Sequence, residues 1–133
     1  MPQRIAHIAL LVRDYDEAIA WYTQKLGFRL IADAPVSPGK RWVLVAPPGQ
    51  GGAQVLLARA EGDDQQARIG DQTGGRVFLF LRTSDFAHDH AAMQAKGVRF
   101  LEPPRQEAYG SVAVFEDLYG NRWDLLQPAD LPR

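Results

Sequence analysis

The run HIALLVR, His7–Arg13, has a counterpart in the second half of the chain in RVFLFLR, Arg76–Arg82. Each run is a short apolar stretch of strand-forming residues, followed by an acidic turn and then by a helical pattern. The first helical pattern ends at Gly27 and the second at Gly97, and this offset equals the offset between the two runs to within one position. These matching offsets indicate that the chain is an internal repeat of one strand–helix unit.

Each repeat predicts one strand, one helix and three more strands. Asp14 is expected to cap the first helix, because its carboxylate can accept from the free N–H groups of the first turn. The expected strands cover 4–13, 28–34, 42–46 and 54–60, then 76–82, 98–101, 111–116 and 122–127, and the second helix covers about 85–96. The sequence therefore predicts an α+β fold of two βαβββ modules in a pseudo-two-fold arrangement. Module 1 is about 1–62, a linker about 63–75 and module 2 about 76–128, within a single domain 1–133.

Length and composition restrict the class of protein. A chain of 133 residues is long enough to fold around its own core. Fifteen Lys and Arg against 16 Asp and Glu give a net charge of −1, which argues against non-specific nucleic-acid binding. The absence of cysteine excludes disulfides, thiol nucleophiles and cysteine-ligated zinc. The early apolar run Ile8–Val12 is too short for a membrane span. We therefore expect a cytoplasmic protein with no nucleic-acid or membrane partner.

Strand alternation predicts which side chains face away from the helices. In the first strand, the strongly apolar face is expected to pack on the helix, which leaves His7 on the opposite face. In the matching strand, the same alternation leaves Arg76, Phe78 and Phe80 facing away from the second helix. The exposed faces of both strands thus carry polar and aromatic side chains.

The repeat also equates two residues of the last strand in each half, Gln54 and Asp124, at the offset that relates Gly27 to Gly97. If the halves pack with two-fold symmetry, His7, Gln54, Arg76 and Asp124 converge on one concave surface. Its apolar walls would be Leu11, Trp42, Leu56, Phe78 and Phe80, with Tyr109 and Arg105 at the rim. Apolar walls with a few convergent polar groups are typical of a small-molecule site. We therefore expect a ligand pocket between the two modules.

Two motifs carry a resemblance to a known family. WYTQKLGF, Trp21–Phe28, resembles the F-Y-x-x-x-L-G-F helix end of the vicinal oxygen chelate superfamily, and DLYGNRWDL, Asp117–Leu125, resembles its D-P-x-G-N-x-x-E-L closing hairpin. The likeness spans the whole chain and implies the paired βαβββ fold, often built into a homodimer. The superfamily includes glyoxalases, extradiol dioxygenases, methylmalonyl-CoA epimerase, fosfomycin-inactivating enzymes and metal-free bleomycin-binding proteins. The resemblance therefore implies a fold without choosing an activity.

The resemblance also implies a candidate metal site. In metal-dependent members the four inward positions carry ligands, which here implies His7, Gln54 and Asp124 for Fe, Mn, Ni, Co or Zn; a direct family alignment places Leu56 instead of Gln54. Arg76 stands where a second histidine ligand would be, and a guanidinium has no lone pair for a metal and repels a divalent cation. Arg76 is expected to pair with Asp124, or else to stay free and bind a carboxylate or phosphate.

Two hypotheses for the function follow. The first is a pocket that binds a small organic molecule without a cofactor, an anionic one where Arg76 is the anchor. The second is a metal-dependent lyase, isomerase or dioxygenase of the glyoxalase type, using His7, Gln54 and Asp124. In an enzyme, His7 and Asp124 are the catalytic candidates, because histidine can act as a base near neutral pH. A homodimer is expected because an open curved sheet needs its edge covered. Whether the protein is an enzyme stays open at this point.

Overall fold

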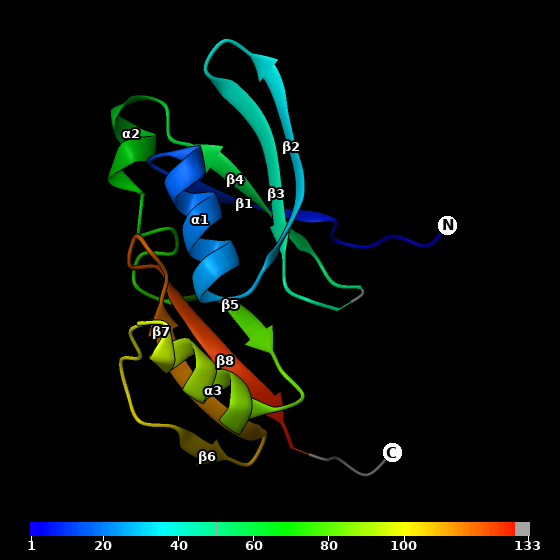
Figure 1. The fold of residues 1–133 in the computed structure, drawn as a ribbon, viewed down its shortest axis with the longest axis vertical. Helices are drawn as coiled ribbons and strands as arrows, with labels where there is room; N and C mark the ends of the chain where they lie inside the picture. Colours follow the sequence, from blue (N-terminus) through cyan, green and yellow to red (C-terminus); the bar gives the residue numbers. More distant parts are fainter. Residues whose placement is uncertain (50, 130–133) are drawn as a thin grey trace. The chain divides into compact units, whose positions relative to one another are not determined.

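The computed structural model describes residues 1–49 and 51–129. By its internal contacts the chain divides into two compact units, unit 1 from Met1 to Ile69 and unit 2 from Gly70 onward. Each unit holds one four-stranded sheet with both parallel and antiparallel strand pairs (Figure 1). In the described part of the chain no helix has the length and apolar character needed to cross a membrane.

Unit 1 begins with the predicted strand–helix pair. Its elements are β1 (His7–Val12), α1 (Tyr15–Lys25), β2 (Arg29–Ser37), β3 (Lys40–Ala46), β4 (Gln54–Arg59) and the short helix α2 (Gly62–Ala67). The sheet order is β1-β4-β3-β2, with β1 and β4 parallel. The Asp14 carboxylate accepts from the Glu17 N–H at 2.8 Å, which confirms the predicted helix cap.

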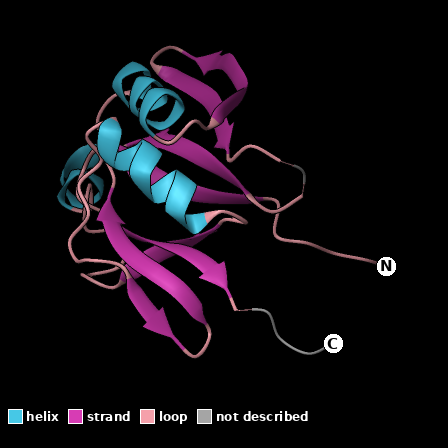
Figure 2. Cartoon of the chain, turned by 60° about the horizontal axis from the view of Figure 1, so that its bottom comes forward, coloured by secondary structure: helices cyan, strands magenta, loops and turns pink. Residues whose placement is uncertain are grey.

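The core of unit 1 lies between α1 and its sheet, where α1 packs against β3 and β4 (Figure 2). Tyr22 of α1 is fully buried, and so are Leu10 and Val12 on β1. These residues occupy the apolar faces that the strand and helix periodicities predict. The opposite face of the sheet carries His7, whose side chain is exposed.

Unit 2 repeats the order of elements of unit 1, but its second strand is shorter than the second strand of unit 1. Its elements are β5 (Val77–Arg82), α3 (Phe86–Ala95), β6 (Arg105–Glu107), β7 (Gly110–Glu116) and β8 (Arg122–Pro128), in the sheet order β5-β8-β7-β6. Its core is aromatic: the Trp123 ring stacks on Phe115 with centroids 5.9 Å apart, and Phe100 lies between Phe115 and His90 of α3. Both units therefore have the order βαβββ, and the predicted α+β fold is confirmed.

Two predicted segments differ from the structure. The stretch expected to be a linker contains helix α2, Gly62–Ala67. The strand expected at 98–101 is reduced to an isolated bridge between Phe100 and Phe115, and the edge strand β6 forms only at Arg105. The intervening residues Pro103 and Pro104 have no N–H to donate, so the sheet ladder is interrupted there.

A third difference is a bulge in β5 that changes which side chains face the helix. Val77 pairs with Arg122 but Leu79 pairs with Trp123, so Phe78 is an extra residue in the strand. Beyond the bulge, Phe80 pairs with Asp124 on the face away from α3, as predicted. At the bulge the predicted alternation is wrong, because the Phe78 ring contacts the buried Trp123 edge-on at 6.3 Å.

Candidate functional site

The exposed face of the unit 1 sheet gathers three of the predicted site residues. His7 and Gln54 are direct partners in the β1–β4 register, so their side chains leave the sheet on the same face. The Trp42 ring meets His7 edge-on, with centroids 5.6 Å apart, and 41% of the Trp42 surface is exposed. The predicted grouping of His7, Gln54 and Trp42 on one face is therefore observed within unit 1.

A cavity opens in unit 1 where β3 and β4 separate. The two strands pair only at Leu44–Leu56 and Val45–Val55, and beyond these pairs the ladder stops. The cavity at this position has a volume of about 450 Å³, within the range of small-molecule sites. Its lining residues come from α1, β2, β3, β4 and α2: Tyr15, Val36, Lys40, Arg41, Trp42, Leu56, Leu57, Ala58, Arg59, Glu61 and Gln65.

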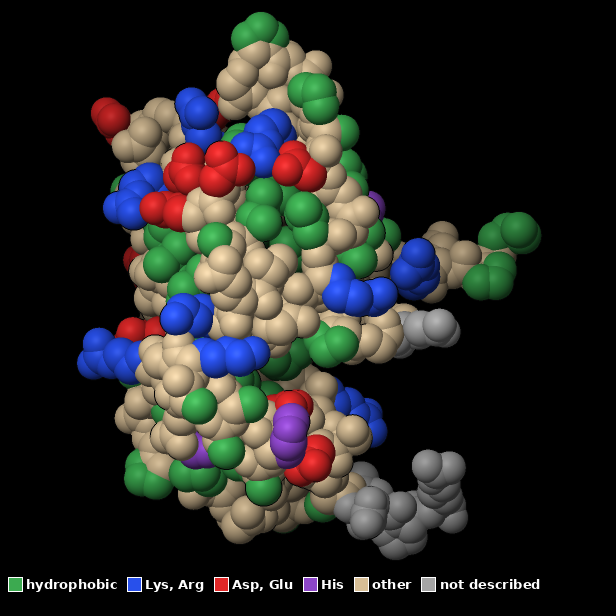
Figure 3. All heavy atoms as spheres, viewed as in Figure 1, with side chains coloured by type: hydrophobic (Ala, Val, Ile, Leu, Met, Phe, Trp, Pro, Cys, Tyr) green, Lys and Arg blue, Asp and Glu red, His purple; other side chains and the backbone are tan. Residues whose placement is uncertain are grey.

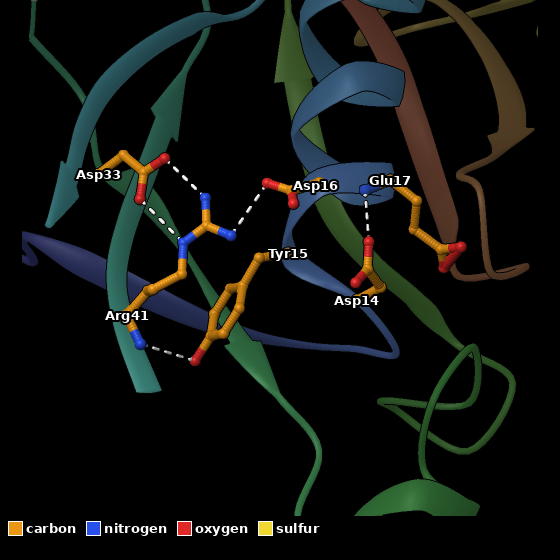
Figure 4. A network of polar contacts seen from close by, with 6 residues as sticks. All are labelled: Asp14, Tyr15, Asp16, Glu17, Asp33 and Arg41. Carbon is orange, nitrogen blue, oxygen red and sulfur yellow. Dashed lines mark hydrogen bonds and ion pairs between the residues drawn. The ribbon is translucent and has the colours of Figure 1, made fainter. Parts of the chain in front are cut away.

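An arginine-centred network holds one wall of this cavity (Figure 4). The Arg41 guanidinium donates to both carboxylate oxygens of Asp33, at 3.0 and 2.7 Å, and to Asp16 on α1 at 2.9 Å. This guanidinium lowers the pKa of the Asp33 carboxyl through its hydrogen bonds. The Arg41 backbone N–H donates to the Tyr15 hydroxyl at 3.2 Å, where the missing β4 partner leaves it without a sheet acceptor. The network therefore joins the Arg41 end of β3 to α1 and β2.

The surface around the network is rich in charge of both signs. In Figure 3 a band of acidic and basic side chains crosses the part of the molecule formed by unit 1. Unit 1 holds the ion pairs of Arg41 with Asp16 and Asp33, and the Arg13–Glu17 pair at 2.7 Å. Lys40 and Arg59, which also line the cavity, have no ion pair within the described residues. The cavity thus combines apolar walls with two cations outside any ion pair.

In unit 2, Asp124 is a buried carboxylate without full hydrogen bonding. Only 7% of the residue is exposed, and its Oδ1 atom has no hydrogen-bond partner among the described residues. Burial raises the pKa of the Asp124 carboxyl; the charge of Arg105 opposes this rise, and the charge of Glu102 adds to it. A buried, unpaired acid is costly for a fold and is more common at functional sites than elsewhere.

The predicted pairing of Arg76 with Asp124 is wrong. The β5–β8 register sets Asp124 beside Phe80, four residues after Arg76, which corresponds to about 13 Å along a strand. Arg76 precedes β5, is exposed, and lines a small polar hollow with Thr73, whose hydroxyl donates to the Arg76 carbonyl. The charged neighbours of Asp124 are instead Arg105 and Glu102.

Of the two predicted rim residues in unit 2, Arg105 is a charged neighbour of Asp124. Arg105 donates to Glu102 at 2.9 Å and to Glu107 at 2.6 Å, so its charge is largely compensated. Tyr109 is 52% exposed. The Phe80 side chain, beside Asp124, is 65% exposed. Of the predicted aromatic wall in unit 2, Phe80 faces away from the helix, and Phe78 packs against Trp123.

The sheet registers correct the equivalence between the two halves. Leu44, the fifth residue of β3, pairs with Leu56 in unit 1, and Val114, the fifth residue of β7, pairs with Asp124 in unit 2. Leu56 is therefore the structural counterpart of Asp124, and the equivalence of Gln54 with Asp124 is wrong. In the same way, the His7–Gln54 pair corresponds to the Val77–Arg122 pair. Both equivalences follow from the strand pairing of each residue within its own sheet.

The sheet registers test whether the predicted metal-ligand positions carry side chains that can bind a metal. The registers make Leu56 the counterpart of Asp124, and a leucine side chain has no donor atom; Arg76, at the fourth predicted position, has no lone pair for a metal. Within the described residues no cluster of three His, Cys, Asp or Glu could hold a metal ion. The donor set therefore does not fit the divalent metal of the metal-dependent members, because two positions cannot supply a ligand.

The residues of the cavity wall were mostly missed by sequence reasoning. Trp42 and Leu56 were predicted, but Tyr15 and Arg41 were not. The sequence does hold a signal for Tyr15, since it is an aromatic residue at the first helical position, directly after the Asp14 cap. Nothing in the sequence shows that β3 and β4 separate, so no pattern indicates that Tyr15 faces a cavity.

We expect Asp124→Asn to stabilise the protein at pH 7 by about 1 kcal/mol, because it removes a buried charge with an unpaired oxygen. A carboxyl whose pKa is raised on folding loses stability as the pH rises from about 4 through its folded pKa. The gain should therefore vanish near pH 4. Urea unfolding at pH 4, 5.5 and 7 measures it, and an equal gain at all three values would contradict this account. Asp63→Asn, on the exposed helix α2, serves as the control.

Comparison with known proteins agrees with the fold. Residues 4–125 match the Glyoxalase/Bleomycin resistance protein/Dioxygenase superfamily. A Shewanella frigidimarina protein of unassigned function is 57% identical over 131 residues, 98% of this chain and 97% of that protein. The solved structure of UcmS2 has a TM-score of 0.82 at 27% identity, covering 95% of this chain and 98% of that one. TnmS3, an antibiotic binding protein from Streptomyces sp. CB03234, has a TM-score of 0.77 at 29% identity, covering 96% and 98%.

The paired βαβββ units thus define the class of fold that the sequence motifs indicated. The chain belongs to the Glyoxalase/Bleomycin resistance protein/Dioxygenase superfamily, and the predicted family is confirmed. The shared pocket between the modules, the homodimer and the cytoplasmic location stay predictions.

Proposed function

We propose that this protein binds a small organic molecule through unit 1, with the ligand held against Trp42, and that binding requires no metal. The observation that supports this most strongly is the cavity of about 450 Å³ between β3 and β4, with the half-exposed Trp42 as a wall. A flat indole with an exposed face supplies a large contact area for an aromatic or conjugated ligand. The antibiotic-binding relative TnmS3 makes antibiotics one class of ligand to test.

The alternative, a metal-dependent lyase, isomerase or dioxygenase using His7, Gln54 and Asp124, has weaker support. The sheet register makes Leu56 the counterpart of Asp124, which favours the family alignment that puts Leu56, a residue without a donor atom, in place of Gln54. His7 packs its ring edge against Trp42 and is exposed, which also suits a ligand contact. We therefore propose His7 as a binding residue on the same face as Trp42.

Replacing Trp42 tests the proposed function. We expect Trp42→Ala to weaken the binding of 2-naphthoate, used as an aromatic probe, at least tenfold, because a large aromatic contact contributes about 2 kcal/mol. Isothermal titration calorimetry measures the dissociation constant, and Trp21→Phe on α1, outside the cavity, is the matched control.

The titration is repeated with EDTA and after dialysis against MnCl2, NiCl2 and ZnCl2. Equal affinity in all conditions is expected for binding without a metal. Binding that needs an added metal and is lost in His7→Ala would establish the alternative. If neither 2-naphthoate nor an antibiotic panel binds, or if Trp42→Ala binds as the parent does, the cavity is not the ligand site.

A further inference from the structure

One lining residue of the unit 1 cavity, Tyr15, has a hydroxyl hydrogen with no acceptor among the described residues. Tyr15 lines the cavity and is 6% exposed. Its oxygen accepts from the Arg41 N–H at 3.2 Å, and the described residues offer it no other hydrogen-bond partner. A phenolic hydroxyl has one hydrogen to donate in addition to its lone pairs, so the donor capacity of Tyr15 is unused. A buried donor without an acceptor costs free energy unless a ligand or a water molecule accepts from it.

The position of this hydroxyl is fixed by the surrounding network. The Arg41 guanidinium lies 5.1 Å from the centre of the Tyr15 ring, and its hydrogen bonds to Asp33 and Asp16 hold it there. The Arg41 N–H then fixes the oxygen of the same tyrosine. Figure 4 shows Tyr15 lying between its helix and the Arg41 strand segment. A donor held in one orientation recognises an acceptor at small entropic cost.

The charges at the cavity indicate what kind of acceptor would be favoured. Arg41 is compensated by its two carboxylate partners, which leaves Lys40 and Arg59 against the single carboxylate Glu61. An excess of positive charge favours an anionic oxygen over a neutral one, and a hydrogen bond to a charged acceptor is about twice as strong.

From these observations we infer that Tyr15 is the specificity-determining hydrogen-bond donor of this cavity. The ligand class is a flat, apolar molecule that carries a carbonyl or carboxylate oxygen, with the carboxylate bound more tightly. This inference rests on the proposed function, since it assigns a ligand class to the same cavity. In this arrangement Trp42 contacts the apolar part of the ligand, and Tyr15 favours ligands that have an oxygen able to accept its hydrogen bond.

Three probes of the same shape test the inference. They are 2-naphthoate, with a charged acceptor, 2-acetylnaphthalene, with a neutral acceptor, and 2-ethylnaphthalene, with none. In the parent protein we expect the affinity to fall in that order. Tyr15→Phe should weaken 2-naphthoate about tenfold or more and 2-acetylnaphthalene severalfold, and should leave 2-ethylnaphthalene unchanged. Tyr22→Phe, two helical turns further along α1 and outside the cavity, is the matched control and should leave all three affinities unchanged.

The acceptor-free probe separates recognition from folding. A structural defect in Tyr15→Phe, where the Arg41 N–H loses its acceptor, would weaken all three probes alike and would overturn the inference. Equal affinity of the parent and Tyr15→Phe for 2-naphthoate would also overturn it, while sensitivity to Trp42→Ala would leave the proposed function standing. Failure of every probe to bind the parent would overturn both.

Discussion

Asp117→Ala should lower the free energy of unfolding by about 3 kcal/mol or more, which is a large part of the stability of a domain this size. Asp117 is 5% exposed and lies in the loop between β7 and β8. Its carboxylate accepts from the N–H groups of Tyr119 and Asn121 at 3.0 Å, from the Asn121 amide at 3.0 Å and from the Trp123 indole at 3.4 Å. Alanine would leave these donors buried without an acceptor.

Replacing Asp117 with asparagine is a more conservative change, and its loss of stability can be compared with that of the alanine variant. Asp117→Asn keeps the oxygen that accepts from the Tyr119 and Asn121 N–H groups but presents an NH2 group to both the Asn121 amide and the Trp123 indole, so we expect an intermediate loss. Asp63→Ala on the exposed helix α2 is the control and should change stability by less than about 0.5 kcal/mol. Urea unfolding followed by tryptophan fluorescence measures all three variants. An Asp117→Ala protein as stable as the control would show that the network contributes nothing.

Gly70→Ala is expected to destabilise the protein by about 3 kcal/mol, because it combines backbone strain with a steric clash. Its backbone has φ +78°, a left-handed conformation that costs an alanine about 1 kcal/mol. A Cβ atom here would also lie 1.9 Å from the carbonyl oxygen of Tyr119, a backbone atom that cannot move aside alone. Near this close contact between Gly70 and Tyr119, Gln72 lies beside Asn121. The Asn121 side-chain oxygen accepts from the Gln72 N–H at 3.1 Å.

Gly74→Ala separates the two costs, because Gly74 has a similar φ of +69° and no atom lies within 4 Å of the position that a Cβ would take. We expect this control to lose only about 1 kcal/mol, the conformational part of the cost. Thermal and urea unfolding of both variants give the difference, which isolates the close approach to Tyr119. Equal losses in the two variants would mean that the loop moves away freely and that the contact is unimportant.

Together these contacts explain the D-x-x-G-N part of the closing motif without any ligand. Asp117 and Asn121 stabilise the turn before β8 and attach the segment around Gly70 to it. The motif therefore identified the family through residues that stabilise unit 2. The candidate binding residues lie elsewhere, which is why the resemblance indicates the fold more strongly than the activity.

The order of elements was determined by the sequence alone. The repeat of apolar runs, the Asp14 cap and the glycines after each helix are local signals, and they act through neighbouring backbone groups. Local signals of this kind can be read from a single chain because both interacting partners are close in sequence. They predicted the βαβββ order correctly in both halves.

The candidate site was decided by tertiary structure. The extra residue Phe78 interrupts the alternation of β5, Phe80 instead of Arg76 lies beside Asp124, and the sheet pairing makes Leu56 the counterpart of Asp124. Beside the opening between β3 and β4, Arg41 donates to Asp16, a residue 25 positions away in the sequence. A shift of one residue in a strand changes which face a side chain occupies, and the sequence period of two does not reveal such a shift. Strand register and the separation of strands arise from contacts between distant segments, so only the folded structure determines them.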